Sequence, residues 1–510
     1  MTLFDSVLVL TLVAILLLRI SHRFAVPYPT MLAIAGVLMA ASPWVPDVHI
    51  DPSFVLALFI APALLDAAYN FPPSALRRYW LPLSVLAGGA VLVTTAAVAG
   101  FAVVWAGMPW AAAIALGAIV SPPDEAAATA MIARLNLPRA TLAILTGESL
   151  LNDTVALFLY STAVGFATSG NDETLFISHV AIALPGALVI GLVLGVAYLY
   201  LAKHLFGTLS GVLFGFVTTF GTWEVADRLD LSPTMAVIAL AMTVARYSSE
   251  RQGAHDRVYA NSVWQLIVFV LNAVAFLLVG LETREIVRAL TQADMLHASA
   301  FALGVFVIIV VARFFCVGLY YRFVLRVSRR PEQRASARAQ SVVIAWCGMR
   351  GLVTLATALA LPASFPARNL IVLSALAAVL GSLILQGLTL GPLIRLMRFA
   401  HDESFDQEIR LARIALLKSA IESLSSATDE GALLLRKTYE VDETLAESGS
   451  CNASRGRLAA LRSQAVREQR EKLQDLRHSA LIEDDVFRAL ERELDMAELG
   501  VSPSAQIEAA

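Results

Sequence analysis

The chain has 510 residues, of which 58% are hydrophobic and only 15% are charged, and its mean hydropathy is +0.70. Soluble globular domains carry about one-quarter charged residues, so this composition excludes an ordinary soluble enzyme and predicts a polytopic helical membrane protein. The formal net charge of −3 gives no reason to expect nucleic acid as a partner. Three widely spaced cysteines form no disulfide or metal-binding pattern, and we expect no cofactor.

Long apolar segments recur from residue 3 to residue 397, and each is a candidate for crossing the bilayer as a helix. The first segment lacks a basic start and a small-residue cleavage site, so we expect a retained span rather than a signal peptide. The thirteen expected spans are 3–20, 27–41, 53–70, 80–105, 110–132, 139–167, 177–202, 209–225, 232–246, 260–281, 299–322, 340–361 and 370–395.

The charges of the connecting loops predict the orientation of these spans. Alternate loops are rich in arginine, and the other loops carry mainly aspartate and glutamate. Basic loops stay in the cytoplasm, so we expect the N-terminus outside and the C-terminus inside, in a plasma membrane of the bacterial inner-membrane type. The most basic of the cytoplasmic loops contains Arg322, Arg326, Arg329, Arg330, Arg334 and Arg338.

The chain changes character after Met397, which divides it into a transmembrane domain, 1–400, and a tail, 401–510. The tail is rich in charged residues and alanine, and no run in it is long enough to span a bilayer. Segments 407–424 and 480–499 carry apolar residues at helical spacing. We therefore expect a cytosolic, mostly helical tail, with a flexible break at 449–457.

Two of the apolar segments are interrupted in the middle. In the fifth span, Pro122-Pro123 removes two backbone donors and is followed by Asp124 and Glu125. In the twelfth span, Gly348 and Gly351 flank Met349-Arg350. Broken helices at equivalent positions of two repeats indicate the ion site of a transporter. The spacing predicts inverted repeats of six spans each, spans 1–6 and 8–13, with crossed broken helices at spans 5 and 12.

The sixth span carries the polar residues Glu148, Ser149, Asn152 and Asp153. Ser149 and Asp153 are four residues apart and share one face of a helix, with Asn152 beside it. Hydroxyl, amide and carboxylate oxygens are hard donors that suit an alkali cation rather than a soft transition metal. Burial disfavours the ionised form of Asp153, so this residue would hold either a proton or a Na⁺ ion, and that competition would couple the two fluxes.

These motifs resemble those of the sodium/proton exchangers of the monovalent cation:proton antiporter family 1, over about residues 1–400. The sequence GESLLND at 147–153 matches the family signature, and 62–69 looks like its third-span motif. Asp124 lies where the family has the aspartate of its Asp-Pro motif, and 347–351 is similar to its glycine-flanked arginine. One departure is that the usual Thr-Asp-Pro is replaced by Pro123-Asp124-Glu125, so only a backbone carbonyl is offered at Pro123.

The resemblance implies secondary antiport of Na⁺ or Li⁺ against H⁺ by alternating access, without enzymatic activity. The sodium ligands would be Asp153, Asp124 and Ser149, with Asn152 and the Pro123 carbonyl beside them. Electrogenic relatives carry two adjacent aspartates where this chain has Asn152-Asp153, so the resemblance implies electroneutral 1:1 exchange. It also implies a homodimer in the lipid bilayer.

The remaining charged residues receive structural or open assignments. The resemblance pairs Glu148 with Arg313 and places Arg350 at the crossing of the broken helices, where its charge would balance helix ends. Asp66 is expected either as a water-linked carboxylate behind the ion site or as a polar packing residue. Asp124 would alternatively cap the half-helix that follows Pro123. The role of Glu125 stays open.

Three other functions compete with sodium/proton exchange. A K⁺/H⁺ antiporter would use the same ligand set, because these residues do not fix the ion's size. An intramembrane aspartyl protease would also place two aspartates on neighbouring spans, but its Gly-x-Gly-Asp motif is absent from the sequence. A cation channel would need a carbonyl-lined filter with repeated glycines, which the sequence also lacks.

Overall fold

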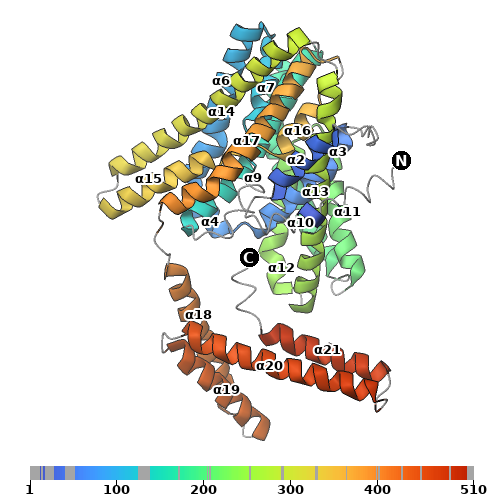
Figure 1. Ribbon diagram of the computed structural model, residues 1–510, viewed down its shortest axis with the longest axis vertical. Helices are drawn as coiled ribbons and strands as arrows, with labels where there is room; N and C mark the ends of the chain where they lie inside the picture. The colour runs from blue at the N-terminus through green and yellow to red at the C-terminus, as the bar shows by residue number, and fades with distance from the viewer. Residues whose placement is uncertain are drawn as a thin grey trace. The chain divides into compact units, whose positions relative to one another are not determined.

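The fold comes from a computed structural model, which describes residues 12, 15–17, 28–40, 52–124, 138–169, 173–203, 205, 208–251, 254–288, 292–327, 331–362, 364–397, 399, 403–426, 429–447, 451–479, 481 and 484–501. It divides into two compact units, Met1–Phe399 and Ala400–Ala510, which we call the membrane unit and the tail unit. Every regular element in the described ranges is helical (Figure 1), as the sequence predicts.

The membrane unit consists of helices of very different lengths. In chain order they are α2 (Tyr28–Ala40), α3 (Pro52–Asn70), α4 (Pro73–Arg78), α5 (Trp80–Leu83), the π-helix η1 (Ser84–Gly89), α6 (Ala90–Ala106), α7 (Trp110–Val120), α9 (Arg139–Ser169), α10 (Glu173–Ala202), α11 (Leu209–Arg228), α12 (Pro233–Arg251), α13 (Ala254–Arg288), α14 (Gln292–Val327), α15 (Pro331–Trp346), α16 (Leu352–Leu359) and α17 (Arg368–Met397).

The described helices agree with the expected spans over most of the chain. The expected spans from 27–41 to 80–105 and from 139–167 to 370–395 each coincide with a helix or with consecutive helices. The span 110–132 is helical to Val120, and its part beyond residue 124 lies outside the described residues, as does almost all of 3–20. The following six are long and apolar enough to cross a membrane: Trp80–Ala106, Arg139–Ala167, Ile182–Ala202, Arg257–Ala275, Leu296–Phe323 and Arg368–Met397. The total of thirteen spans stays a prediction.

The membrane unit has two groups of helices that pack mainly within themselves (Figure 1). One group contains α6, α7, α9 and α14 to α17, and the other contains α2, α3 and α10 to α13. Two contacts between the groups are those of α3 with α16 and of α2 with α17. A buried hydrogen bond from Thr30 Oγ1 of α2 to the Leu383 carbonyl of α17, at 3.1 Å, lies in this second contact.

Helix α7 lies in the centre of its group. It is apolar on every side, and most of its residues from Ala112 to Val120 are buried; a helix without a polar face belongs in a bundle interior. Helices α10 and α14 instead leave large apolar side chains such as Val193 and Leu303 exposed, at 60% and 62%, as lipid-facing helices do. The interruption that follows α7 is therefore held deep in the protein.

The tail unit is built from two helical hairpins, α18 (Glu403–Ser423) with α19 (Glu430–Glu447) and α20 (Cys451–His478) with α21 (Asp484–Val501). Lys418 lies 3.6 Å from Glu443 and 3.3 Å from Glu447, and Arg470 pairs with Asp495 and Glu498 at 2.5 and 2.7 Å. The expected break at 449–457 is wrong from residue 451 onward, where α20 begins. A single internal glycine, Gly456, costs a helix only about 1 kcal/mol, which the flanking alanine, leucine and arginine residues offset.

Candidate functional site: the crossing of two broken helices

The two helix interruptions predicted from the sequence meet in the membrane unit. Helix α7 ends at Val120 and residues 121–124 continue without helical structure, while residues 347–351 separate α15 from α16. The backbone N–H of Asp124 donates to the carbonyl of Met349 at 2.7 Å. We call these two segments, 121–124 and 347–351, the crossing.

Each broken helix supplies a charge to an end of the other one. The N–H of Leu352, the first residue of α16, donates to Asp124 Oδ2 at 3.0 Å. In return, Arg350 Nε donates at 2.7 Å to the carbonyl of Val120, the last residue of α7. A carboxylate thus faces the positive end of one helix dipole, and a guanidinium faces the negative end of another. Unpaired helix ends are costly in a low-dielectric interior, so these two reciprocal contacts stabilise the crossing.

The carboxylate of Asp124 therefore caps α16, a helix more than two hundred residues away in the chain. The alternative role expected from the sequence was a cap on the half-helix after Pro123. That half-helix, and with it Glu125, lies outside the described residues. The cap that the structure describes joins the two broken helices.

Two glycines allow the charged side chains to approach this closely. A Cβ atom on Gly351 would overlap the carboxylate of Asp124, and one on Gly348 would overlap the Arg313 side chain. Arg350 is only 1% exposed, and its guanidinium also donates to the Gly348 carbonyl. The glycines that mark the interruption in the sequence are thus the positions where side chains from other segments enter.

Helix α17 anchors the crossing from behind. The backbone N–H of Arg350 donates to Ser382 Oγ at 2.8 Å, and Trp346 Nε1 donates to Thr389 Oγ1 at 2.9 Å. The sequence analysis missed Ser382 and Thr389. The signal that was available is weak, since each is an isolated hydroxyl within the long apolar run of residues 370–395.

The Pro123 carbonyl is the point where the crossing meets α9. Ser149 Oγ lies 3.2 Å from this oxygen and Asn152 Nδ2 lies 3.3 Å from it, and both side chains donate to it. Both donors come from α9, so this carbonyl ties the crossing to that helix. The structure thereby brings together Pro123, Ser149 and Asn152, which the sequence analysis named as cation-site residues.

One oxygen of this cluster is left without a hydrogen-bond donor. Because the Pro123 carbonyl only accepts, the Asn152 amide turns its NH₂ group towards it, and Oδ1 faces the other way. Asn152 is fully buried, and Oδ1 has no hydrogen-bond partner within the described parts of the chain. A buried acceptor without a partner is costly, and a cation or a water molecule would satisfy it.

Asp153 follows directly in α9 and lies within electrostatic range of Asp124. Glu148, on the same helix, is only 1% exposed and pairs with Arg313 of α14 through two bonds, of 2.5 and 3.1 Å. Arg313 also donates to the carbonyl of Ile344 in the last turn of α15, at 3.1 Å from Nη2. The ion pair therefore joins α9, α14 and the end of α15.

Asp66 lies on α3, which packs against α16 and α9. Its described hydrogen bond runs along its own helix, from Asn70 Nδ2 to Asp66 Oδ1 at 3.1 Å. The carboxylate is half-buried. Its part in the ion site stays a prediction.

Comparisons with known proteins identify relatives of this chain. The family model described as "Sodium/hydrogen exchanger, transmembrane" matches residues 8–396. The Na⁺/H⁺ antiporter NhaP of Pseudomonas aeruginosa is 31% identical over 68% of this chain and 82% of its own length. The sodium, potassium, lithium and rubidium/H⁺ antiporter of Bacillus pumilus is 28% identical over 84% of this chain and 67% of its own.

A solved structure has the same fold. The sodium proton antiporter of Methanocaldococcus jannaschii aligns with a TM-score of 0.59 and 18% sequence identity, covering 78% of this chain and 100% of its own. At that identity the match concerns the fold alone. It agrees with the all-helical membrane architecture that the composition predicts.

Proposed function

Because this chain belongs to the sodium/hydrogen exchanger family, we propose that it exchanges Na⁺ or Li⁺ for H⁺, one for one, at the crossing and the adjoining face of α9. The protein is a membrane transporter and not an enzyme. The observation that carries the proposed site is the cluster around the Pro123 carbonyl, where Asn152 Oδ1 is a buried acceptor without a donor in the described structure.

The charge balance of the site favours Asp153 as the residue that exchanges cation and proton. Glu148 is paired with Arg313, Arg350 faces the end of α7, and Asp124 faces the start of α16. Among the described residues, neither an arginine nor a helix end interacts with the Asp153 carboxylate in this way. Asp153 is half-buried, and a carboxylate inside a membrane protein without a compensating partner is stable only when a proton or a cation neutralises it.

The proposed sodium ligands are Asp153, Asp124, Ser149, Asn152 and the Pro123 carbonyl. All of them offer hard oxygen atoms, and the hydroxyl and the amide already lie within 3.3 Å of the carbonyl. With H⁺ or Na⁺ bound, Asp153 is neutral. Only the neutral site would cross between the two sides of the membrane by alternating access, which produces obligatory exchange without net charge movement.

Transport of K⁺ is a second candidate, favoured by the Bacillus pumilus relative, whose name includes sodium, potassium, lithium and rubidium. The proposed ligands do not discriminate by ion size, because carboxylate, hydroxyl, amide and carbonyl oxygens are hard donors that bind any alkali cation. We therefore include K⁺ in the test.

The test is ion-dependent proton flux in proteoliposomes that contain the purified full chain. A pH gradient is imposed, Na⁺, Li⁺ or K⁺ is added, and the rate is measured with the membrane potential either clamped at zero or imposed. We expect flux with Na⁺ and Li⁺ at a rate that the potential does not change. A rate that follows the potential would contradict 1:1 exchange, and flux with K⁺ alone would establish the second candidate.

The variant Asp153→Asn identifies the site in the same assay. We expect it to fold and to lose exchange, because an amide is neither protonated nor able to neutralise a cation. Asp475→Asn, which changes an exposed carboxylate on α20, is the matched control and should transport like the wild type. Exchange at the wild-type rate in Asp153→Asn would remove this residue from the mechanism.

A further inference from the structure

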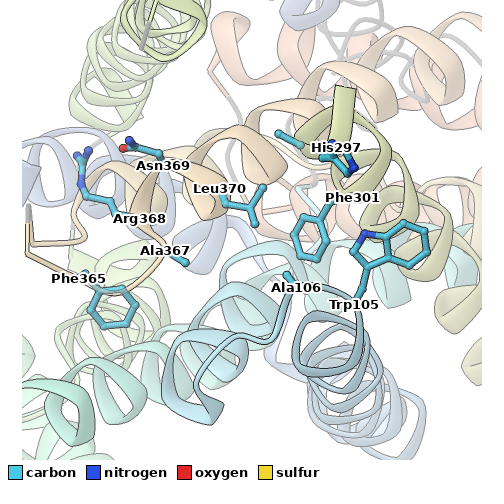
Figure 2. A pocket seen from close by; sticks show the side chains of 10 residues that line it. Trp105, Ala106, His297, Phe301, Phe365, Ala367, Arg368, Asn369 and Leu370 are labelled. Atoms are coloured by element: carbon cyan, nitrogen blue, oxygen red, sulfur yellow. The ribbon is translucent and has the colours of Figure 1, made fainter. Parts of the chain in front are cut away.

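A cavity of about 570 Å³ lies at one end of the membrane unit, away from the crossing. It is formed where α6 ends and where α14 and α17 begin, and Figure 2 shows the side chains that line it. Its volume is within the range of small-molecule pockets, roughly 300 to 1,000 Å³. The loop charges predict that this end of the helices lies at the outer face of the membrane.

The lining combines aromatic walls with nitrogen donors. Trp105, Phe301 and Phe365 supply aromatic rings, and Arg368, His297 and Asn369 supply groups that donate hydrogen bonds. No aspartate or glutamate is among the ten lining residues. This chemistry is opposite to that of the crossing, whose donors are oxygens, so the cavity suits an anion rather than the transported cation.

The guanidinium of Arg368 is held in a fixed orientation at this cavity. Its Nε donates to the Leu361 carbonyl at 3.0 Å, and Nη2 donates to the Leu359 carbonyl at 3.4 Å. In the described part of the chain these bonds use two of the five N–H groups of an arginine, which leaves three for a ligand. A guanidinium that is already ordered loses little conformational entropy when it binds an oxyanion.

The apolar wall beside Arg368 continues onto the lipid-facing surface. The ring of Phe301 stacks on Phe101 with centroids 5.4 Å apart, and Phe101 contacts Trp105 at the same centroid distance. Trp105 is 61% exposed and lies at the edge of this wall. An occupant with an anionic head and an apolar chain would satisfy both parts of this surface.

From these observations we propose that the cavity binds a phosphate group, that of an anionic phospholipid, with Arg368 as its main donor and the ring of Trp105 against the lipid chain. Arginine recognises phosphate through paired N–H donors, and tryptophan is favoured at the membrane–water interface. The same oxyanion chemistry is offered by inorganic phosphate in solution, which the test distinguishes.

The cavity is linked to the crossing through α16. Asp124 caps the first residue of this eight-residue helix and Arg368 binds the carbonyls at its end, a separation of about 12 Å at 1.5 Å per residue. A phosphate that draws on Arg368 therefore acts on the helix that Asp124 also holds. We therefore expect phosphate binding at Arg368 to alter the rate of cation exchange. That effect rests on the proposed function, whereas the binding itself does not.

The test uses the fluorescence of Trp105 in the full chain, reconstituted in phosphatidylcholine vesicles. Brominated phosphatidylglycerol or brominated phosphatidylcholine is added at equal content, and the difference between the wild type and Trp105→Phe gives the quenching of Trp105 alone. We expect stronger quenching by phosphatidylglycerol. Inorganic phosphate added to the buffer either reverses the quenching, which assigns the cavity to soluble phosphate as well, or leaves it, which assigns the cavity to the lipid.

The variant Asn369→Asp decides whether the lining is responsible. Asn369 is exposed and lies in the first turn of α17, where an acidic residue favours the helix, so the variant should fold. We expect the apparent affinity for phosphatidylglycerol to fall about tenfold through like-charge repulsion, while the neutral control Asn369→Gln keeps it. Equal quenching by the two lipids, or an unchanged preference in Asn369→Asp, would overturn the proposal without bearing on cation exchange.

Discussion

At the residue scale, the buried charges at the crossing and on the adjoining face of α9 each have an opposite charge or a helix end as a partner. Glu148 is matched by a guanidinium, Asp124 by the N–H end of a helix, and Arg350 by a carbonyl end. A buried charge without a partner is costly, so these residues are fixed in place by electrostatics. The proposed exchange depends on Asp153 being the exception.

The hydroxyl of Ser149 gives a direct test of the ligand set. Ser149→Ala removes one oxygen beside the Pro123 carbonyl, and the loss of one polar contact costs about 1 to 3 kcal/mol. We expect the apparent KM for Na⁺ to rise several-fold, measured as Na⁺-dependent proton flux in vesicles. Ser161→Ala, on the same helix, removes an exposed hydroxyl that bonds only to Phe158 in the described structure, and should leave KM unchanged.

The result would count against Ser149 as a ligand if its KM for Na⁺ stayed at the value of the Ser161→Ala control. A fall in the maximal rate with unchanged KM would also exclude Ser149 from the ligand set, since the residue would then act on the conformational step.

The ion pair of Glu148 and Arg313 should matter for stability more than for ion selectivity. Glu148→Gln leaves the guanidinium buried without its counter-charge, and breaking a buried pair in this way costs about 3 to 5 kcal/mol. We expect a clear fall in the Tm of the detergent-purified protein. Glu224→Gln, which breaks an exposed pair with Arg228 on α11, should change Tm little.

A stable Glu148→Gln protein with altered selectivity among Na⁺, Li⁺ and K⁺ would show that the structural assignment is wrong. The double variant Glu148→Gln/Arg313→Gln should recover part of the lost Tm, because it removes both buried charges. Full recovery is not expected, since Arg313 also donates to the Ile344 carbonyl.

At the scale of the elements, the broken helices depend on one another for their ends. Helix α16 has no side-chain cap from its own segment and begins just after Gly351, so its first N–H group relies on Asp124 of the other broken helix. Helix α15 ends against Arg313, and α7 ends against Arg350. These half-helices are therefore completed by tertiary contacts, which lets their ends lie inside the protein.

The position of Gly351 gives a test of this arrangement. A Cβ atom there would overlap the Asp124 carboxylate, so Gly351→Ala should displace the cap, reduce the exchange rate strongly and lower Tm. The control is Gly318→Ala on α14, where a Cβ would meet nothing within 4 Å and where alanine favours the helix by about 0.5 to 1 kcal/mol. Equal exchange rates in the two variants would show that the contact between Asp124 and Gly351 is dispensable.

At the scale of the whole molecule, the chain consists of two units that each have buried apolar residues. In the tail unit these include Ala446, Val466, Leu473 and Phe487, and ion pairs join the helices of both hairpins. The homodimer, the inner-membrane location and the orientation of the termini stay predictions. The tail charges are consistent with the cytoplasmic placement that the loop arginines indicate.

The division into units predicts the outcome of a truncation. A chain that stops after Phe399 keeps the crossing and every described helix of the membrane unit, so it should purify as a folded protein and exchange cations in vesicles. If the tail regulates transport, we expect the truncated protein to differ from the full chain in the pH dependence or the maximal rate of exchange. A truncated protein that folds, shown by an unaltered Tm, but has lost all exchange would contradict the assignment of the exchange site to the membrane unit alone.

The amino-acid sequence by itself determined much of the architecture. Hydropathy located the membrane helices, because burial in lipid requires long apolar runs, and Pro122-Pro123 and Gly348 to Gly351 located the two interruptions, because proline and glycine act on the local backbone. The four-residue spacing of Ser149 and Asp153 placed them on one helical face. Local rules also misled, since they favoured a break at 451–457 where packing and propensity sustain α20.

Only the tertiary structure decided which groups meet. That Asp124 caps α16, that Arg350 reaches Val120, that Ser382 holds the Arg350 backbone and that Asn152 Oδ1 lacks a donor among the described residues are all consequences of how distant helices cross. The physical reason is that helix ends and charges in a low-dielectric interior must be matched, but any correctly placed partner satisfies that demand. The sequence next to a buried charge or helix end therefore does not indicate which distant residue becomes its partner in the fold.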